Sequence, residues 1–553
     1  MFVLSAAEMQ ECDRATAERF NLSSIDLMRA ASFALASFAQ ARFPNIRRVT
    51  VLCGRGNNGG DGMMTARLLS DAGLQITTIL LGEPCGLKGD AAIAWRELVN
   101  CQRGTIHVVI SAEGLPHLND ALDTDLVVDA VLGTGFKPPM KGLALDALNW
   151  LRGSAAPVLS ADLPSGWPAD STDLLPNTPV FPSDAVVTFT APKPAHVFGQ
   201  LTRRWDQPVV VAPIGSPNEA IASDLKVEWT GSAVEMVQAP RAADSNKGKY
   251  GHVLVIGGTF GAVEGKAGAP AMAALGALRI GAGLVTAAVP IAAMGVVSAI
   301  APELMTWGLE TSSAGAISDE NLAAEKIDTL LTGKSVLAIG PGLGQMPETS
   351  RFTTELLSKT SVPAVIDADA LNILAKEPEL IARLAKGRTI VLTPHPGEMA
   401  RLTGKTVAEV QARRLEIARA FAERMGVTLV LKGARTLVAH PDGRVAVNTT
   451  GNPGMAKGGS GDLLTGFIAG MLAQFPADAA RAVEAAVYLH GLAADFAVRE
   501  GDEHTLLATD CLAYLPRAFK APVSHLHNSG PSSYVWIQGA ARDGDVPGEV
   551  GHG

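Results

Sequence analysis

Short apolar runs alternate with amphipathic segments along the first 215 residues of the chain. Six of the runs are continuous enough to be strands buried on both faces. They lie at residues 47–53, 75–81, 105–110, 125–132, 157–162 and 184–190. Helical periodicity between several of them predicts βαβ units and a mostly parallel sheet. Two further helical patterns, at residues 5–20 and 23–43, precede the sheet.

A second alternating pattern begins near residue 251, after a polar and interrupted stretch. Its apolar runs lie at 251–258, 284–289, 335–340, 364–371, 389–394, 428–433 and 445–450, and helical patterns follow at 460–475 and 481–500. We therefore predict an α/β fold with two tandem domains. The predicted boundaries are 1–216 for the first domain, 217–241 for a linker, 242–517 for the second domain and 518–553 for a disordered tail.

Length and charge narrow the class of protein. A chain of 553 residues is too long for one ordinary core. The formal net charge is −9 without any basic block, which argues against a nucleic-acid or anionic-membrane partner. No apolar run is long enough to span a bilayer, and the N-terminus lacks the features of a signal peptide. The five cysteines form no C-x-x-C pair, which predicts a reducing, cytoplasmic setting without structural zinc.

The sequence GRGNNGGDG, residues 54–62, follows a predicted strand and precedes a helical pattern that begins at Met63. Glycines there permit positive φ, and free N–H groups at a helix start attract anions. A hydride-transfer dinucleotide site would also need an acid about 20 residues later, and Glu83 is somewhat late for that role. Asn57, Asn58 and Asp61 instead supply oxygens suited to a hard cation or a sugar. The plain alternative is a turn that uses asparagine in left-handed conformations.

Two aspartates follow other strands of the same predicted sheet. Asp129 lies within an apolar strand that leads into a glycine loop, and Asp162 ends the next strand and is followed by Pro164, Ser165 and Gly166. A single aspartate at a strand end is commonly a turn former or helix cap. Because the carboxyl ends of parallel strands form one crevice, we expect these side chains to converge on a ligand.

Together, GRGNNGGDG, VDAVLGTGF and DLPSGW resemble the N-terminal domain of the NAD(P)H-hydrate epimerase family (the YjeF N-domain), over roughly the first 215 residues. The resemblance implies a Rossmann-like three-layer α/β/α domain with a potassium ion held by Asn58, Asp129 and Ser165. It implies that Asp162 contacts substrate and acts as the acid–base residue, a role that a pKa raised by burial would favour. The implied substrate-binding residues are Asn57, Asn58, Gly59, Gly60, Asp61, Gly133, Thr134, Gly135, Phe136, Lys137, Pro138, Pro139 and Asp162.

The most informative stretch of the second half is NPGMAKGGSGDLLTG, residues 452–466. Gly458, Gly459 and Gly461 open a predicted helix, and Asp462 lies in its first turn. Backbone donors at such a turn stabilise phosphoryl oxygens, and an acid beside them can act as a base. Asp462 taken alone could equally be a charge that complements the helix dipole.

This turn resembles the anion hole of the ribokinase-like superfamily. With GPGLG at 340, LTPHPGEMARL at 392 and LKGARTLV at 431, it resembles more narrowly the ADP/ATP-dependent NAD(P)H-hydrate dehydratase family, over about residues 245–515. The implied nucleotide-binding residues are Lys432, Gly433, Ala434, Arg435, Thr436 and Gly461. The implied substrate residues are Ala269, Gly342, Gly344, His395 and Asp462, with Asp462 as catalytic base.

Two positions of the second domain allow more than one interpretation. His395 on its own would more often be a turn histidine, although the prolines of TPHPGE favour an oriented donor. Lys457 stands where the family pattern leads us to expect a small or hydroxylated residue. It could pair with a nucleotide phosphate or point to solvent, which bears on the preference for ADP or ATP.

The two resemblances together imply a bifunctional enzyme that repairs hydrated NADH and NADPH. The first domain would interconvert the R and S epimers with K⁺ bound, and the second would dehydrate the S epimer with ADP and Mg²⁺. The resemblance also implies a homo-oligomer whose partners are small molecules: the NADH and NADPH hydrates and ADP. The alternative is a ribokinase-like vitamin or sugar kinase with a non-enzymatic N-terminal binding module, since Asp462 would serve either reaction.

Overall fold

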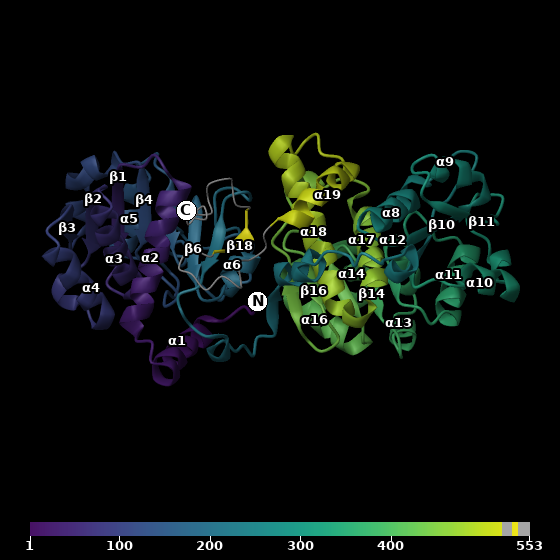
Figure 1. Ribbon diagram of the computed structural model, residues 1–553, viewed down its shortest axis with the longest axis horizontal. Coiled ribbons are helices and arrows are strands. Elements are labelled where there is room, and N and C mark those ends of the chain that lie inside the picture. The colour runs from purple at the N-terminus through teal and green to yellow at the C-terminus, as the bar shows by residue number, and fades with distance from the viewer. Residues whose placement is uncertain (522–533, 540–553) are drawn as a thin grey trace. The chain divides into compact units, whose positions relative to one another are not determined.

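Two α/β units make up the chain in the computed structural model, which describes residues 1–521 and 534–539 (Figure 1). The first unit comprises Met1–Trp229 with Pro522–Gly553, and the second comprises Thr230–Ala521. Two tandem α/β domains are therefore confirmed. The predicted linker at 217–241 is wrong in part, because it contains β8 (Val227–Trp229), a 3₁₀ turn (Thr230–Val234) and α7 (Glu235–Gln238).

The first unit is built around one sheet with the strand order β18-β7-β6-β5-β4-β1-β2-β3. All neighbours in it are parallel except β18, which runs antiparallel to β7. Its elements are α1 (Ala6–Phe20), α2 (Ser24–Arg42), β1 (Arg48–Cys53), α3 (Asn57–Asp71), β2 (Gln75–Leu81), α4 (Gly89–Asn100), β3 (Thr105–Val109), β4 (Leu126–Ala130), α5 (Leu143–Leu151), β5 (Val158–Ala161), β6 (Ala185–Phe189), α6 (Pro194–Phe198), β7 (Val209–Ala212) and β18 (Val535–Gln538). The chain order reverses between β1 and β4, and such a switch point opens a crevice at the carboxyl ends.

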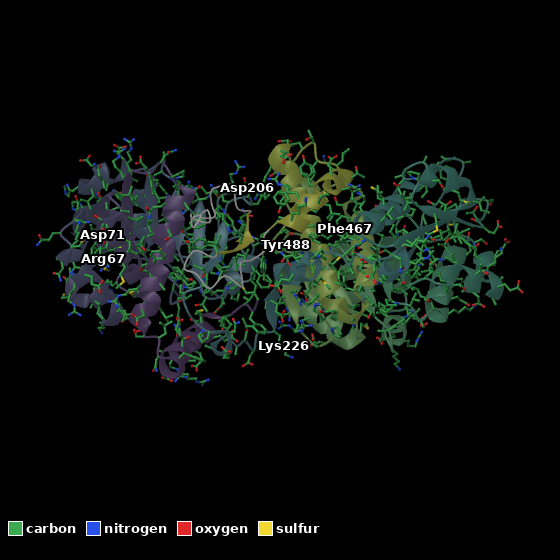
Figure 2. The ribbon with its side chains drawn as sticks, viewed as in Figure 1. Arg67, Asp71, Asp206, Lys226, Phe467 and Tyr488 are labelled. Atoms are coloured by element: carbon green, nitrogen blue, oxygen red, sulfur yellow. The ribbon has the colours of Figure 1, made fainter. Side chains whose placement is uncertain are left out.

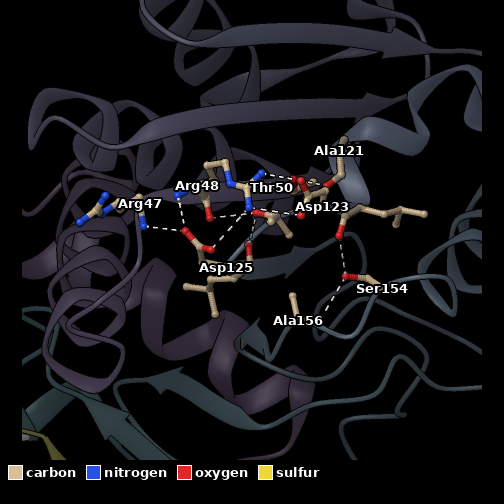
Figure 3. Close-up of polar contacts among 11 residues, drawn as sticks. Arg47, Arg48, Thr50, Ala121, Asp123, Asp125, Ser154 and Ala156 are labelled. Atoms are coloured by element: carbon tan, nitrogen blue, oxygen red, sulfur yellow. Dashed lines mark hydrogen bonds and ion pairs between the residues drawn. The ribbon is translucent and has the colours of Figure 1, made fainter.

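The amino ends of β1 and β4 are tied together by polar contacts (Figure 3). The Asp125 carboxylate accepts hydrogen bonds from the backbone N–H groups of Arg47 and Arg48, both at 2.8 Å. The Arg48 guanidinium donates to Asp123 at 2.6 Å, and the Thr50 hydroxyl donates to the Ala121 carbonyl at 2.6 Å. These contacts fix the register of the two central strands at the edge of the sheet opposite the crevice.

The second unit has the strand order β11-β10-β9-β12-β13-β14-β15-β16-β17, parallel up to β15 and antiparallel beyond it. Its strands are β9 (His252–Ile256), β10 (Leu284–Pro290), β11 (Met305–Leu309), β12 (Val336–Ile339), β13 (Ala364–Ile366), β14 (Ile390–Leu392), β15 (Thr428–Leu431), β16 (Leu437–Ala439) and β17 (Val445–Val447). Its helices are α8 (Gly268–Arg279), α9 (Met294–Ser298), α10 (Ala324–Leu331), α11 (Pro347–Lys359), α12 (Ala368–Leu374), α13 (Glu379–Leu384), α14 (Pro396–Thr403), α15 (Val407–Ala412), α16 (Arg414–Met425), α17 (Ser460–Gln474), α18 (Ala479–Glu500) and α19 (Cys511–Lys520).

The two helices α17 and α18 are buried along most of their length, as their nearly continuous apolar sequence predicts. Phe467 of α17 and Tyr488 of α18, both labelled in Figure 2, are buried, and the Phe467 ring meets that of His490 edge to face at 5.5 Å. In the described part of the chain, no single helix is long and apolar enough to cross a membrane. Only the bent pair Ser460–Gln474 and Pro476–Glu500 meets that test, and only when taken together.

The predicted disordered tail, 518–553, is wrong in two places. Helix α19 continues to Lys520, and β18 pairs with the edge strand β7 of the first unit (Figure 1). The Tyr534 hydroxyl donates to the Ala34 carbonyl at 2.8 Å, and the rings of Tyr534 and Trp536 pack against Phe38 of α2. A strand of four residues with two aromatic side chains in and beside it is too short a pattern to predict from the sequence. The rest of the predicted tail lies outside the described residues.

The docking of β18 predicts a graded loss of stability. Trp536 is only 8 % exposed. Its replacement by alanine removes a large aromatic contact and should lower the free energy of unfolding of the first unit by about 3 kcal/mol. Tyr534→Phe removes one hydrogen bond and should lower it by about 1 kcal/mol. Calorimetry of the full chain measures both, and the transition of the second unit should not move.

Leu175→Ala is the matched control, because this apolar side chain of the first unit is 66 % exposed and should change the free energy of unfolding by less than about 0.5 kcal/mol. If Trp536→Ala behaved like Leu175→Ala, β18 would not stabilise the sheet.

Candidate active sites

A cavity of about 1030 Å³ opens at the carboxyl ends of the first sheet. It is lined by residues that follow β1, β2, β4 and β5 and by α1 and α2. Of the predicted substrate-binding residues, the lining includes Asn57, Asn58, Asp61, Gly133, Thr134, Gly135, Phe136 and Asp162. Gly59 and Gly60 lie in the first turns of α3 behind this wall, and Lys137, Pro138 and Pro139 continue the loop beyond it. The strand-end convergence expected from the sequence is therefore present.

The glycines after β1 permit close packing and do not adopt the positive φ values that the sequence predicts. Helix α3 begins at Asn57, six residues before the predicted start, so neither asparagine adopts a left-handed conformation. A Cβ atom on Gly59 would lie 1.9 Å from the Gly54 carbonyl oxygen, and one on Gly62 would lie 2.5 Å from the Ala130 Cβ. Glycine at these positions allows α3 to approach β1 and β4 closely. The helix N-terminus consequently reaches the cavity.

Asp162 is the most constrained acid of this cavity. It follows β5, is 8 % exposed and has a φ of +61°, a conformation that costs energy for a non-glycine residue. Its Oδ1 accepts hydrogen bonds from the Lys193 ammonium and the Thr188 hydroxyl, both at 2.8 Å. The His196 Nε2–H donates to the Asp162 carbonyl at 2.7 Å, since the other ring nitrogen accepts from the Lys193 N–H.

These contacts keep the Asp162 carboxyl ionised. Burial alone would raise its pKa, but the Lys193 ammonium and the hydrogen bonds from Lys193 and Thr188 outweigh burial and hold the pKa below its usual value. Burial lowers the pKa of His196 to about 4, so that imidazole is neutral. The raised pKa considered for Asp162 is therefore wrong, because a buried lysine accompanies this carboxyl. Ionised Asp162 is suited to accept a proton.

The three predicted potassium ligands lie around the switch point. Asp129 is fully buried, and its carboxylate accepts from the Ser165 hydroxyl at 2.5 Å and the Ser165 N–H at 2.8 Å. The Ser165 hydroxyl oxygen in turn accepts from the N–H of Leu132, next to Gly133. The Asn58 side chain packs against Gly133, and its amide oxygen and nitrogen are buried without a hydrogen-bond partner among the described residues. A buried oxygen without a partner among the described residues is a suitable ligand for a hard cation.

In the second unit, Asp462 lies in the first turn of α17. Gly459, the residue directly before this helix, has a φ of +95°. Burial and the nearby Asp367 carboxylate raise the pKa of Asp462 to about 6, against the lowering influence of Lys432. A base is most effective when its pKa lies near the working pH, so this carboxylate is better suited to proton transfer than an exposed one.

Half-buried Lys432 and buried Asp367 form an ion pair beneath this turn. The Lys432 ammonium lies 2.8 Å from Asp367 Oδ1 and 4.0 Å from Glu398, and a Cβ atom on Gly461 would lie 3.3 Å from it. Asp367 Oδ2 accepts from the Thr465 hydroxyl of α17 at 2.7 Å. The sequence motifs predict Lys432 and Gly461 at the site, but Asp367 was missed. An aspartate directly after the buried strand Ala364–Ile366 was the available indication, the same one that identified Asp162.

The predicted nucleotide loop, Lys432 to Thr436, forms a tight turn between β15 and β16. Gly433 and Arg435 have φ values of +132° and +55°, and the Thr436 hydroxyl donates to the Gly433 carbonyl at 2.9 Å. The Arg435 guanidinium is directed to the Thr449 carbonyl at 3.1 Å, and Arg414 donates to the Leu431 carbonyl at 3.2 Å. Gly433 and Ala434 thus leave mainly backbone groups for a ligand.

His395 begins α14 as its N-cap. Its Nδ1 accepts from the N–H groups of Gly397 at 2.9 Å and Glu398 at 3.3 Å, which leaves the proton on Nε2. The side chain is 51 % exposed, and burial together with Lys432 lowers its pKa. The two interpretations of His395 are therefore compatible, because the cap itself orients Nε2 as a donor.

Ala269 and the GPGLG loop are neighbours in the second unit. A Cβ atom on Gly342, whose φ is +64°, would lie 3.3 Å from the Ala269 Cβ. The Gly344 N–H donates to Asp369 at 2.9 Å. Lys457, by contrast, is exposed and donates to the His504 carbonyl, which agrees with the solvent-facing orientation considered for it. In the described part of the chain, no group of three or more His, Cys, Asp or Glu side chains is arranged to hold a metal ion.

Comparison with known proteins agrees with this division. Residues 24–195 match the family model described as YjeF-related protein N-terminus, and residues 253–517 match the model described as NAD(P)H-hydrate dehydratase. The bifunctional NAD(P)H-hydrate repair enzyme Nnr of Moorella thermoacetica is 40 % identical over 530 residues, which cover 93 % of this chain and 96 % of that protein. This chain belongs to the family of bifunctional NAD(P)H-hydrate repair enzymes.

More distant relatives of the family give the same picture. The bifunctional NAD(P)H-hydrate repair enzyme Nnr of Escherichia coli is 33 % identical, and the match covers 96 % of each chain. The crystal structure of the ADP/ATP-dependent NAD(P)H-hydrate dehydratase from Bacillus subtilis, co-crystallised with ATP and Mg²⁺, is 34 % identical; the match covers 52 % of this chain and 96 % of that one, with a TM-score of 0.42. The two family models and the full-length relatives confirm the predicted epimerase and dehydratase domains of this repair family.

The raised pKa of Asp462 predicts a pH-dependent gain in stability for Asp462→Asn. Above about pH 6 the half-buried carboxylate is ionised, which opposes folding, because its pKa in the folded chain lies above the usual 3.8. A tenfold difference in proton affinity corresponds to about 1.4 kcal/mol, so the variant should raise the free energy of unfolding of the second unit by about 1–3 kcal/mol at pH 8. The gain should shrink as the pH falls through 6 and vanish below 3.8, where the carboxyl is neutral in both the folded and the unfolded chain. Urea unfolding between pH 4 and 8 measures it.

Asp478 supplies the matched control, because it caps α18 from an exposed position and its carboxylate accepts from the Arg481 N–H. Asn replaces Asp well at an N-cap, so Asp478→Asn should give no gain at any pH. A loss of stability in Asp462→Asn at pH 8 would instead identify Asp462 as a structural cap.

Proposed function

We propose that this chain repairs hydrated NADH and NADPH in two steps at two separate sites. The first unit interconverts the R and S epimers of the hydrate, and the second removes water from the S epimer while it consumes ADP. One observation carries this assignment: each unit holds a lysine paired with a buried aspartate at the carboxyl edge of its own parallel sheet, with a further acid beside it. Each unit thus has a separate set of groups that can move protons.

The dehydratase step follows from the position of Asp462. Its carboxylate takes the proton of the substrate hydroxyl, whose oxygen attacks the terminal phosphoryl group of ADP and releases AMP. The ring nitrogen then expels phosphate from the neighbouring carbon, and loss of a proton from the next carbon restores the dihydropyridine. The backbone N–H groups around Gly461 at the start of α17 face the phosphoryl oxygens. Mg²⁺ bound with the nucleotide would neutralise phosphoryl charge.

In the same proposal, Lys432 to Thr436 hold the nucleotide largely through their backbone, and Ala269, Gly342, Gly344 and His395 hold the hydrate. Lys457 would not contact the nucleotide, because its ammonium is engaged by the His504 carbonyl. We also propose that the enzyme works in the cytoplasm, which accords with its five free cysteines.

The potassium site is the third element of the proposal. Asn58, Asp129 and Ser165 would provide one amide, one carboxylate and one hydroxyl oxygen, all hard ligands. The unpaired amide of Asn58 supports this assignment, since a buried polar group without a partner otherwise lowers stability by about 1–3 kcal/mol. The ion would anchor the loop that begins at Gly133, which forms one wall of the cavity.

Asp462→Asn tests the second activity directly. Loss of a general base should slow dehydration of the pure S hydrate by about 10²–10⁴-fold, with ADP binding and epimerisation retained. The assay incubates the full chain with mixed hydrate epimers, ADP and Mg²⁺, and follows the recovery of absorbance of the reduced cofactor. Wild-type protein should convert both epimers, whereas a variant still active near the wild-type rate would remove Asp462 from the mechanism.

Asn58→Leu tests the potassium site without removing any hydrogen bond of the described structure. The variant should fold with unchanged or higher stability, and it should lose potassium activation of epimerisation by about 10–100-fold, a typical effect of perturbing a metal site. Dehydration of the S hydrate should be unchanged. Titration of K⁺ in the epimerase assay measures the loss.

Asp129→Ala removes the only formal charge among the proposed ligands and should have the same effect on epimerisation. Ser160→Ala is the control, because its hydroxyl lies 3.3 Å from Asp129 but is not a proposed ligand. Potassium activation that survives both Asn58→Leu and Asp129→Ala would contradict the site.

A further inference from the structure

Besides Asp162, another acid faces the cavity of the first unit, and it comes from a helix rather than from the end of a strand. Asp13 belongs to helix α1, outside the sheet, and lines the cavity together with Met9 and Gln10. Its Oδ1 atom is buried and has no hydrogen-bond partner among the described residues. A carboxyl group that lines a cavity and is not used by the surrounding protein is available to a ligand.

Asp13 differs from Asp162 in its surroundings. Lys193 donates a hydrogen bond to Asp162 at 2.8 Å, whereas no such contact joins Lys193 to Asp13 Oδ1 in the described structure. Burial raises the pKa of Asp13 to about 6, an increase that Lys193 limits and Asp162 reinforces. The titratable groups around Asp13 are Lys193, Asp162, Asp61 on α3 and the Cys12 thiol on α1 itself.

We propose that Asp13 is the second acid–base residue of the epimerase and works as the partner of Asp162. This inference rests on the proposed function of the first unit. Inversion of the hydrated carbon requires hydroxide to leave from one face of the ring and water to add to the other. One group must therefore give a proton while another takes one, and two carboxyls in opposite protonation states supply this pair.

Each inversion moves one proton through this pair of carboxyls. Protonated Asp13 gives its proton to the hydroxyl of the hydrate, the bond between carbon and oxygen breaks, and water departs as the ring nitrogen forms an iminium ion. A water molecule then attacks the same carbon from the other face and loses a proton to ionised Asp162. The net change is one proton moved from Asp13 to Asp162, and exchange with solvent restores the starting state. The reverse direction passes through the same states in the opposite order: Asp162 returns the proton that it has taken up to the departing hydroxyl, and the attacking water gives its proton to Asp13.

Asp61 is the competing candidate, since it also lines the cavity. Burial together with the neighbouring carboxylates raises its pKa well above the usual value. Such a group holds its proton more tightly than an ordinary carboxyl and is suited to donate a hydrogen bond to the substrate. Asp13 is favoured as the proton donor because its Oδ1 atom is buried at the cavity wall without a partner among the described residues, and because its pKa of about 6 lies near the working pH.

The deciding experiment compares Asp13→Asn, Asp61→Asn and Asp162→Asn in the full chain. Pure R hydrate and pure S hydrate are each followed to the other epimer without nucleotide, and kcat and KM are measured from pH 5 to 8. We expect Asp13→Asn to lower kcat by about 10²–10⁴-fold in both directions with KM nearly unchanged. The wild-type kcat/KM for R hydrate should fall as the pH rises through about 6, and this limb should be absent in Asp13→Asn.

Gln10→Ala is the matched control, because Gln10 lines the same cavity one helical turn earlier on α1. It should change KM more than kcat and keep the pH limb. Dehydration of pure S hydrate with ADP should be normal in every variant, which shows that the second unit is intact, and an unchanged calorimetric transition of the first unit shows that the unit carrying each substitution is folded.

Three outcomes overturn the proposal. If Asp13→Asn keeps kcat within twofold of wild type while Asp162→Asn is inactive, Asp13 is not the partner. If Asp61→Asn alone removes the pH limb, the acid is Asp61. If wild-type protein fails to epimerise either hydrate, the proposed function of the first unit falls, and the role of Asp13 falls with it.

Discussion

A lysine paired with a buried aspartate is the interaction on which both sites depend. A carboxylate removed from water would take up a proton unless a cation accompanied it. Lys193 keeps Asp162 ionised in the first unit, and Lys432 pairs with Asp367 in the second. With that charge fixed, a neighbouring acid without its own cation, Asp13 or Asp462, has a raised pKa near 6. The two units thus use the same electrostatic arrangement for different reactions.

The arrangement requires that strand ends and helix starts come close together. Parallel strands bring their carboxyl ends to one edge, and helices α3 and α17 begin at that edge in the two units. Gly59 and Gly62 let α3 approach the strands so closely that any side chain there would collide with backbone or with Ala130. The glycine-rich motif of the first unit is therefore a packing device that places Asn58 and Asp61, in addition to any contact with substrate.

Parts of the chain far apart in sequence complete the first unit. Strand β18, close to the C-terminus, covers the edge strand β7, and the aromatic residues Tyr534 and Trp536 pack on Phe38 of α2. An earlier residue of the same helix, Ala31, lines the cavity. An unpaired strand edge invites association with other chains, so β18 also protects the sheet. A fragment that ended near Ser216 would lack this strand.

The sequence by itself determined the two α/β domains, most strands, and the residues at strand ends such as Asp129 and Asp162, because buried parallel strands give continuous apolar runs and polar residues interrupt them at the edge. It also predicted that Asp462 lies in the first turn of a glycine-rich helix start, which the structure confirms for α17. Only the tertiary structure decided that β18 belongs to the first sheet and that Asp13 and Asp367 face the sites. It also decided that Asp162 is ionised. The reason is physical: pairing with β7 depends on a neighbour more than 300 residues away, and the pKa of a carboxyl depends on which charges the fold brings within a few ångströms.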